Sequence, residues 1–365
     1  MELTALKPLY SVPGPFASVY LDLQAGVADP SRQVPPRWDA LRAALVAQGA
    51  DAASLEAMEA RLSALTRGAL ADSGRAMIAA GGRVLLDQPL PTSIGGDQAA
   101  VTALPHVGPL LTSRDTHVPH MLVVLDRQGA DIYNYDSEFS AECIVVGRDY
   151  PLHKPHAGSW SHRRYHQRVE NFWEQNAAEA AAEIDRIVCA TKPEILILAG
   201  DARARAALRG RLGHRSRGLL VETDRGGRAE GSPADSLREE VERLAGECDI
   251  RRHDRLVSRF EEEPGPQDRA VQGVRPTVAA VRRAQVGTLL LDFTTVEGMT
   301  LWVGRRDPVE LATSESELRD LGVTDCVQER LDDALIAGCA ATDAGFSAIT
   351  AAELDLTDGV GALLR

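Results

Sequence analysis

The sequence predicts an α/β protein built from three α/β domains in tandem. Its 365 residues exceed what a single hydrophobic core usually organises. Short apolar runs typical of strands alternate with segments whose apolar residues recur at helical spacing, which is the pattern of α/β folds. Segments rich in Pro and Gly, together with changes in charge, place the three domains at residues 1–116, 117–216 and 217–365.

The first domain is predicted to contain a strand, two helices and a hairpin. The helices follow from helical spacing of apolar residues, and the hairpin from two apolar runs that flank Gly81-Gly82. Segments rich in Pro and Gly, 89–96 and 105–109, then close the domain. The predicted elements are Phe16–Leu23, Arg37–Gln48, Ser54–Leu70, Arg75–Ala80 and Arg83–Leu86.

The middle domain is predicted to contain a hairpin, a third strand, a long helix and a buried strand. The short, fully apolar run at 194–199 is typical of a parallel strand that is buried on both faces. Gly200-Asp201 follows this run, and we interpret it as a tight turn with Asp201 as a helix N-cap rather than as a site. The predicted elements are His120–Asp126, Ala130–Tyr135, Ala141–Val146, His162–Ala190 and Glu194–Ala199, followed by a helix rich in Arg and Ala.

The third domain is predicted to begin near residue 217 and to alternate again between helices and strands. A long charged helix comes first, and the run Glu261–Pro266 breaks it. The predicted helices are 232–262, 274–284 and 326–341, and the predicted strands are 287–293, 299–303 and 347–350.

Charge is distributed unevenly along the chain. The net charge is −13, made up of −2 in residues 1–116, +1 in 117–217 and −12 in 218–365. Only the middle third is therefore a candidate for contact with phosphate, whereas the acidic last third suits a protein partner or simple solubility. No apolar run is long enough to span a membrane, and the first ten residues do not resemble a signal peptide.

Five scattered cysteines without zinc-like spacing predict a reduced, cytoplasmic protein. The sequence contains no phosphate-binding loop of the GxxxxGK[ST] type, so hydrolysis of nucleoside triphosphates by that route is not expected. We expect no cofactor and no metal.

The segment from Arg148 to Arg168 is the most unusual part of the sequence. Within 21 residues it contains four His, five Arg or Lys and Trp160, and its only acid is Asp149. A cationic, aromatic loop on an acidic protein predicts contact with nucleic acid. The predicted RNA-binding residues are Lys154, His156, Gly158, Ser159, Trp160, His162, Arg163, Arg164 and Arg168.

Several of these residues allow other interpretations. Trp160 suits stacking on a base, although a Trp also serves as a core anchor. His162 and His166 stand four apart on one helix face, a spacing that Zn²⁺ can use, but no carboxylate or Cys nearby completes a site. His156 and His162 are also candidates for general acid or base catalysis on an ester. The arginines can contact phosphate or form a solvated helix face with neighbouring acids.

Three ordered features resemble the archaeo-eukaryotic class-one peptide-chain release factor and Pelota superfamily. The middle domain has that superfamily's order of hairpin, loop, long helix and apolar strand, which ends here in Ile195–Gly200. Residues 271–291 resemble a helix and strand of the superfamily's C-terminal domain, and Asp358–Arg365 resembles its closing sequence. The resemblance covers residues 120–365. The first domain lacks the codon-reading Asn-Ile-Lys-Ser motif, and this points to the bacterial branch, which includes Balon-like ribosome hibernation factors.

The resemblance implies a position for the cationic loop. In release factors this loop carries Gly-Gly-Gln, which positions a water molecule at the peptidyl-tRNA ester. Alignment on Arg164-Tyr165 places Gly158-Ser159-Trp160 on that tripeptide. An indole has one donor and no acceptor, so Trp160 cannot hold a water molecule as an amide does. The resemblance therefore implies docking on ribosomal or transfer RNA rather than release by the family mechanism.

These observations predict a tRNA-shaped translation factor that binds the ribosomal A site. It would act as a hibernation or stress factor, with ribosomal RNA and P-site transfer RNA as partners and no membrane. The acidic C-terminal domain would contact a translational GTPase, as the family's third domain does. Two alternatives stay open. One is a peptidyl-tRNA hydrolase or rescue release factor that uses His156 or His162, and the other is an adaptor that uses the acidic domain alone.

Overall fold

The computed structural model describes residues 1–22, 30–64, 74–90, 92–115, 118–126, 129–135, 141–146, 176–228, 234–262 and 269–365. These residues form two compact units. Unit 1 comprises Met1–Thr116 and Asp254–Arg365, and unit 2 comprises His117–His253. Both units combine β-sheets with packed helices, which confirms the α/β class.

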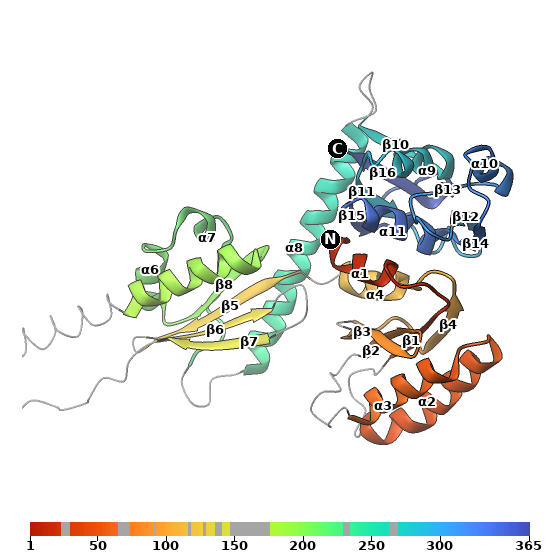
Figure 1. Ribbon diagram of the computed structural model, residues 1–365. Coiled ribbons are helices and arrows are strands. Elements are labelled where there is room, and N and C mark those ends of the chain that lie inside the picture. Colours follow the sequence, from red (N-terminus) through yellow and green to blue (C-terminus); the bar gives the residue numbers. More distant parts are fainter. Residues whose placement is uncertain are drawn as a thin grey trace, which may run out of the picture. The chain divides into compact units, whose positions relative to one another are not determined.

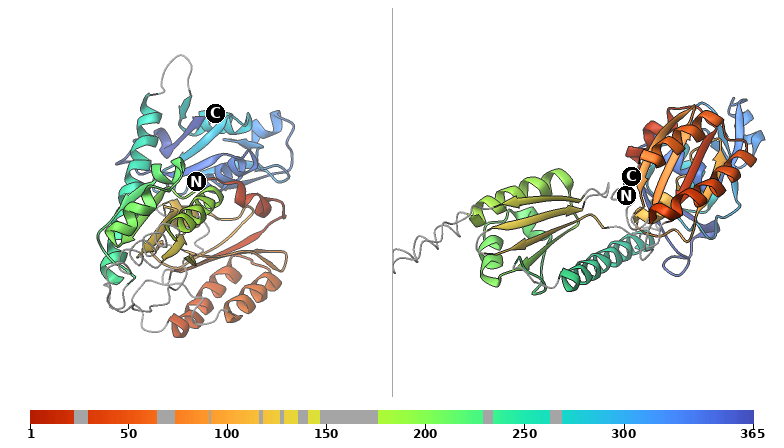
Figure 2. Two further views of the ribbon diagram at one scale, coloured as in Figure 1. Left: turned by 90° about the vertical axis from the view of Figure 1, so that its left-hand side faces the viewer. Right: turned by 90° about the horizontal axis from the view of Figure 1, so that it is seen from below.

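The first sheet of unit 1 is antiparallel, with the strand order β3-β2-β1-β4. Its strands are β1 (Phe16–Leu21), β2 (Arg75–Ala80), β3 (Arg83–Pro89) and β4 (Gln98–Thr102). Helices α2 (Pro30–Ala47) and α3 (Ala52–Ala64) cover one face (Figure 1), and Figure 2 shows them from two further directions. Trp38, Leu45 and Met58 form a core there with Val19 and Met77.

The C-terminal part of unit 1 contains two more sheets. The larger has the strand order β10-β16-β11-β15, and the smaller has the order β13-β12-β14. Helices α9 (Val274–Arg282) and α11 (Leu331–Ala341) pack on one face of the larger sheet, and the end of α8 (Ala234–Glu262) packs on the other. The remaining elements are β10 (Ala270–Gln272), β11 (Val286–Leu291), β12 (Thr300–Gly304), β13 (Leu311–Ala312), α10 (Glu315–Asp320), β14 (Cys326–Arg330), β15 (Gly345–Ala348), η2 (Thr357–Gly359) and β16 (Val360–Leu364).

The beginning and the end of the sequence share one hydrophobic core. The second face of the first sheet packs together with α9, α11 and β11, as well as with η1 (Thr4–Leu6), α1 (Lys7–Tyr10) and α4 (Gly108–Asp115). The amino group of Met1 donates a hydrogen bond to the Phe346 carbonyl (2.7 Å), and Leu3 N donates to Ala344 O (3.2 Å). The three-domain division therefore stays a prediction, since unit 1 contains most of both predicted terminal domains.

Unit 2 is a five-stranded sheet with helices on both faces and the strand order β7-β6-β5-β8-β9. The helical segment 176–191 packs on one face with α6 and α7, whereas the first part of α8 packs on the other. The elements are β5 (His120–Leu125), β6 (Ala130–Tyr135), β7 (Ala141–Val146), β8 (Ile195–Gly200), α6 (Ala202–Arg209), α7 (His214–Gly218) and β9 (Leu220–Glu222). β8 is parallel to β5 and β9, which confirms the predicted buried parallel strand.

Three predictions for unit 1 were wrong or incomplete. Residues 326–341 are not one helix, because Cys326–Arg330 pairs with β12 before α11 begins. Helix α2 begins at Pro30 rather than after Pro35 and Pro36, so both prolines lie inside the helix. Strand β4 and helix α4 lie where only irregular segments were expected.

In the described part of the chain, no helix is long and apolar enough to cross a membrane. The thiols of Cys189, Cys326 and Cys339 are free among the described residues.

Candidate functional site

The predicted RNA-binding and catalytic residues, Lys154 to Arg168, lie outside the described residues. Their roles therefore stay predictions. The structure describes instead the two places where the chain enters and leaves this segment, at the end of β7 and at the start of the helical segment 176–191.

Both places lie at one edge of the unit 2 sheet. In the strand register, Val146 at the end of β7 pairs with Ala130, and Ala130 pairs with Leu125 at the end of β5. Leu125 pairs on its other side with Gly200, the last residue of β8. The parallel strands β5 and β8 thus end where β7 ends, and ligand sites of α/β sheets often lie at such a carboxyl edge.

A small cavity of about 60 Å³ lies at the same edge. Its walls come from the β5–β6 turn, from the first turn of the helical segment and from α6, and they are mostly apolar. Asp126, Asn176 and Arg203 supply the polar groups of the lining. Because Asn176 lines this cavity, the second end of the undescribed segment lies beside the first.

Arg228 ties the β5–β6 turn to the chain that follows β9. Its Nη1 donates to Asp126 Oδ1 and its Nε donates to Asp131 Oδ2, both at 2.9 Å. The hydrogen bond to Asp131 raises the pKa of Arg228 further, although partial burial opposes this. One guanidinium therefore holds two carboxylates at the edge where the cationic segment begins.

The turn after β8 is built as the sequence predicts. Gly200 has φ +105°, and a Cβ added there would lie 2.0 Å from the Leu125 carbonyl oxygen. Asp201 Oδ1 accepts hydrogen bonds from Arg203 N and Ala204 N, both at 3.0 Å, and so caps α6. This confirms the N-cap interpretation.

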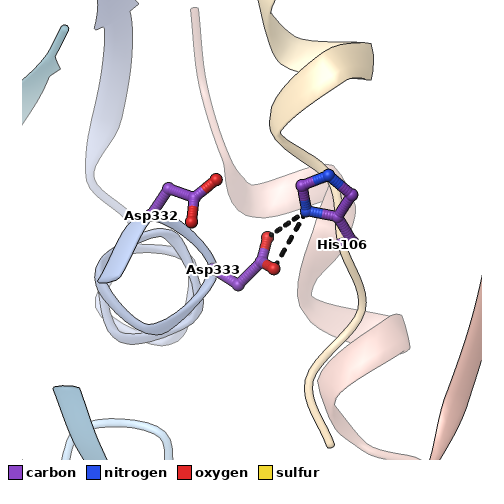
Figure 3. Close-up of side chains that lie close together, drawn as sticks. All are labelled: His106, Asp332 and Asp333. Carbon is purple, nitrogen blue, oxygen red and sulfur yellow. Dashed lines mark hydrogen bonds and ion pairs between the residues drawn. The ribbon is translucent and has the colours of Figure 1, made fainter. Parts of the chain in front are cut away.

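A group of titratable side chains, His106, Asp332 and Asp333, lies buried in unit 1 (Figure 3). His106 Nδ1 lies 3.0 and 3.1 Å from the two carboxylate oxygens of Asp333, in the first turn of α11. Val107 N donates to Asp333 Oδ1 at 3.3 Å. Arg330 forms two hydrogen bonds to Asp332, at 3.0 and 3.1 Å, and its Nε lies 3.5 Å from Asp333.

Burial and the neighbouring charges shift the pKa values of Asp333 and His106. Burial raises the pKa of Asp333 to about 6. Burial alone would lower the pKa of His106, but the hydrogen bond and the charge of Asp333 outweigh it, so the pKa of His106 is raised. With His106 protonated, two cations face two carboxylates, and the group is electrically neutral.

In the described part of the chain, His106, Asp332 and Asp333 are the group whose possible ligand atoms lie close enough together to hold a metal ion, within 4.8 Å of one another. Arg330 already supplies the positive charge, and the side chains of both Asp residues are almost completely buried. The arrangement is that of a buried structural ion pair between His106 and Asp333, which are 227 residues apart in the sequence. We call this pair the buried joint. Sequence reasoning missed it, and the only local signal is an Asp pair at the start of an otherwise apolar helix.

The comparison with known protein families bears on unit 2. Residues 119–266 match the model of bacterial archaeo-eukaryotic release factor family 2. This segment is therefore similar to the bacterial branch of the release factor superfamily. The match runs from the start of β5 to just beyond α8, so it includes the sheet, its carboxyl edge and the cationic segment. It confirms the resemblance inferred from the order of elements.

Sequence similarity to two other proteins extends over the whole chain. Two Mycobacterium tuberculosis proteins, the uncharacterized proteins Rv2629 and MT2704, are 28% identical over 377 residues, which cover 100% of this chain and 97% of each relative. Among solved structures, the archaeal termination factor aRF1 is 15% identical, with 99% of this chain and 96% of that chain covered and a TM-score of 0.27. Archaeoglobus fulgidus Pelota is 13% identical, with 100% and 92% covered and a TM-score of 0.32.

Proposed function

We propose that this chain is a ribosome-associated translation factor that occupies the A site in the shape of a transfer RNA and acts in hibernation or stress protection. The observation that carries the proposal is a sequence that reads Gly158-Ser159-Trp160 where we align the Gly-Gly-Gln of release factors, within a segment that matches a release factor family. This match supports the ribosome as the partner. The missing Gln removes the amide that would orient water at the peptidyl-tRNA ester.

The arrangement of unit 2 supports this use of the cationic segment. Val146 and Asn176, which bound the undescribed stretch, both lie at the carboxyl edge of the sheet. A basic segment fixed at both ends on one edge suits contact with ribosomal RNA, and Trp160 suits stacking on a base, which contributes about 1–3 kcal/mol.

The acidic C-terminal residues support a protein partner. Residues 218–365 carry net charge −12, which repels RNA at long range and favours a basic or mixed protein surface. We propose a translational GTPase as this partner and the cytoplasm as the location.

Co-sedimentation with vacant ribosomes over a series of salt concentrations tests the proposal. We expect binding that weakens steeply with salt, because phosphate contacts release counterions. Trp160→Ala and the pair Arg163→Gln/Arg164→Gln should weaken binding. The matched control is Arg238→Gln/Arg243→Gln, which removes the same charge from arginines that pair with acids on α8. Absence of co-sedimentation at low salt would refute the proposal.

A peptidyl-tRNA hydrolase or rescue release factor is the alternative, and the two candidate histidines of the cationic segment favour it. Incubation with ribosome-bound peptidyl-tRNA separates the two functions. Release that is lost in His156→Ala or His162→Ala would establish the hydrolase, whereas binding without release supports the hibernation factor.

A further inference from the structure

A second basic surface lies in the described part of unit 2. Residues 202–217 contain six Arg and one His but no acid, in a chain whose net charge is −13. This stretch forms α6, α7 and the turn between them. We call it the α6–α7 face.

Two of its arginines have a structural role. Arg205 is buried, and its Nη1 lies 3.3 Å from Glu222 Oε2, while its Nη2 pairs with Asp224. Arg209 Nη1 lies 2.8 Å from Glu222 Oε1. Both positive charges are thus used to attach α6 to the end of β9.

Three other arginines are exposed and have no carboxylate partner among the described residues. These are Arg203, Arg215 and Arg217. The only side-chain hydrogen bond that Arg217 donates within the described part of the chain goes to the Leu212 carbonyl, at 2.9 Å, which leaves its charge uncompensated.

The arginines on the other face of the same sheet are arranged differently. On α8, Arg238 pairs with Asp235, Arg243 pairs with Glu240 and Glu247, and Arg251 lies 3.9 Å from Glu247. The α6–α7 face and α8 cover opposite faces of the sheet (Figure 1), as their separate cores show. Among the described residues of unit 2, arginines without a carboxylate partner are therefore concentrated on the α6–α7 side of the sheet.

The basic side chains stand on a fixed backbone. Asp185, on the helical segment 176–191, accepts hydrogen bonds from Gly213 N (2.9 Å) and from Ser216 Oγ at the start of α7. Leu208 and Leu212 are buried in the core beneath. Because the backbone is already ordered, binding through these arginines would cost little additional conformational entropy.

We propose that the α6–α7 face binds the phosphodiester backbone of structured RNA, with Arg203, Arg215 and Arg217 on the phosphates. A guanidinium matches phosphate geometry with paired donors, and an acidic protein needs such an uncompensated cluster to approach RNA. The identity of this RNA as ribosomal rests on the proposed function. The surface itself goes beyond it, since it lies outside the Arg148–Arg168 segment.

The test compares two triple variants of the full chain that remove the same charge. One is Arg203→Gln/Arg215→Gln/Arg217→Gln on the α6–α7 face, and the control is Arg238→Gln/Arg243→Gln/Arg251→Gln on α8. Affinities for vacant ribosomes and for a free double-stranded RNA are measured against salt. We expect the α6–α7 variant to lose at least about tenfold in affinity and to reduce the log–log salt slope by roughly 2–3, at somewhat less than one per phosphate. The control should retain wild-type values.

The possible outcomes of these binding measurements distinguish this inference from the proposed function. If the wild type binds ribosomes and the α6–α7 variant binds them equally well, this inference is overturned and the proposed function stands. Absence of wild-type ribosome binding, together with RNA binding that depends on the three arginines, would support the surface and overturn the proposed function. Equal losses in both triple variants, or equally strong competition by polyglutamate, would overturn the assignment to RNA phosphate.

Discussion

The buried joint between His106 and Asp333 predicts that Asp333→Ala destabilises unit 1 strongly. The change removes the carboxylate that accepts hydrogen bonds from His106 and Val107, and it leaves His106 and Arg330 with less negative charge around them. Removal of one partner of a buried ion pair costs about 3–5 kcal/mol. Because Arg330 keeps two hydrogen bonds to Asp332, we expect the lower end, about 3 kcal/mol.

Urea unfolding of the full chain measures this loss, and amide hydrogen exchange locates it. Protection should fall in β1, α4 and α11 of unit 1, while β5 and β8 of unit 2 keep theirs. His106→Ala should produce the same pattern, and if Asp333→Ala prevents folding, the histidine variant carries the test.

The matched control is Asp343→Ala. Asp343 also joins the two ends of the sequence, since it pairs with Lys7 (2.7 Å) and accepts a hydrogen bond from Thr4, but its side chain is 54% exposed. Exposed pairs are screened by solvent, so little destabilisation is expected. Equal losses from Asp333→Ala and Asp343→Ala would refute the reasoning, as would a loss of protection confined to unit 2.

Three further predictions concern pH and the turn after β8. Folding raises the pKa of Asp333 to about 6 and also raises the pKa of His106, so the folded state binds more protons than the unfolded chain. The contribution of the joint to the free energy of unfolding should therefore fall as pH rises from about 4 through 7. The difference in unfolding free energy between wild type and His106→Gln/Asp333→Asn, measured at acidic and alkaline pH, checks this sign. Asp201→Ala should cost about 1 kcal/mol in urea unfolding, because α6 loses its cap. Gly200→Ala should cost about 3 kcal/mol in the same assay, whereas Gly218→Ala, with open space around it, should be nearly neutral.

The local sequence pattern predicted much of the secondary structure of unit 2. Alternating or continuous apolar runs predicted β5, β6, β7 and β8 to within a residue, because the period and the burial of a strand determine which residue types occur at its neighbouring positions. The same holds for the N-cap at Asp201. The order of these elements carried the family resemblance, which the match at residues 119–266 confirmed.

Local pattern failed where an element depends on a distant partner. Cys326–Arg330 is a strand because β12 pairs with it, and its own residues do not distinguish it from the helix that follows. Strand β4 forms on the outer side of β1 for the same reason, since its residues Gln98–Thr102 lie at an edge that only the folded sheet provides.

The sequence by itself determined the α/β class and the elements of the middle region, and it revealed the cationic segment for which we predict contact with RNA. Only the tertiary structure decided that residues 1–116 and 254–365 share a core, that His106 meets Asp333, and which arginines of 202–217 have no carboxylate partner among the described residues. The physical reason is common to all three. Periodicity and capping act within a few turns of chain, whereas the burial of a charge or its neutralisation depends on groups that folding brings together from more distant parts of the sequence.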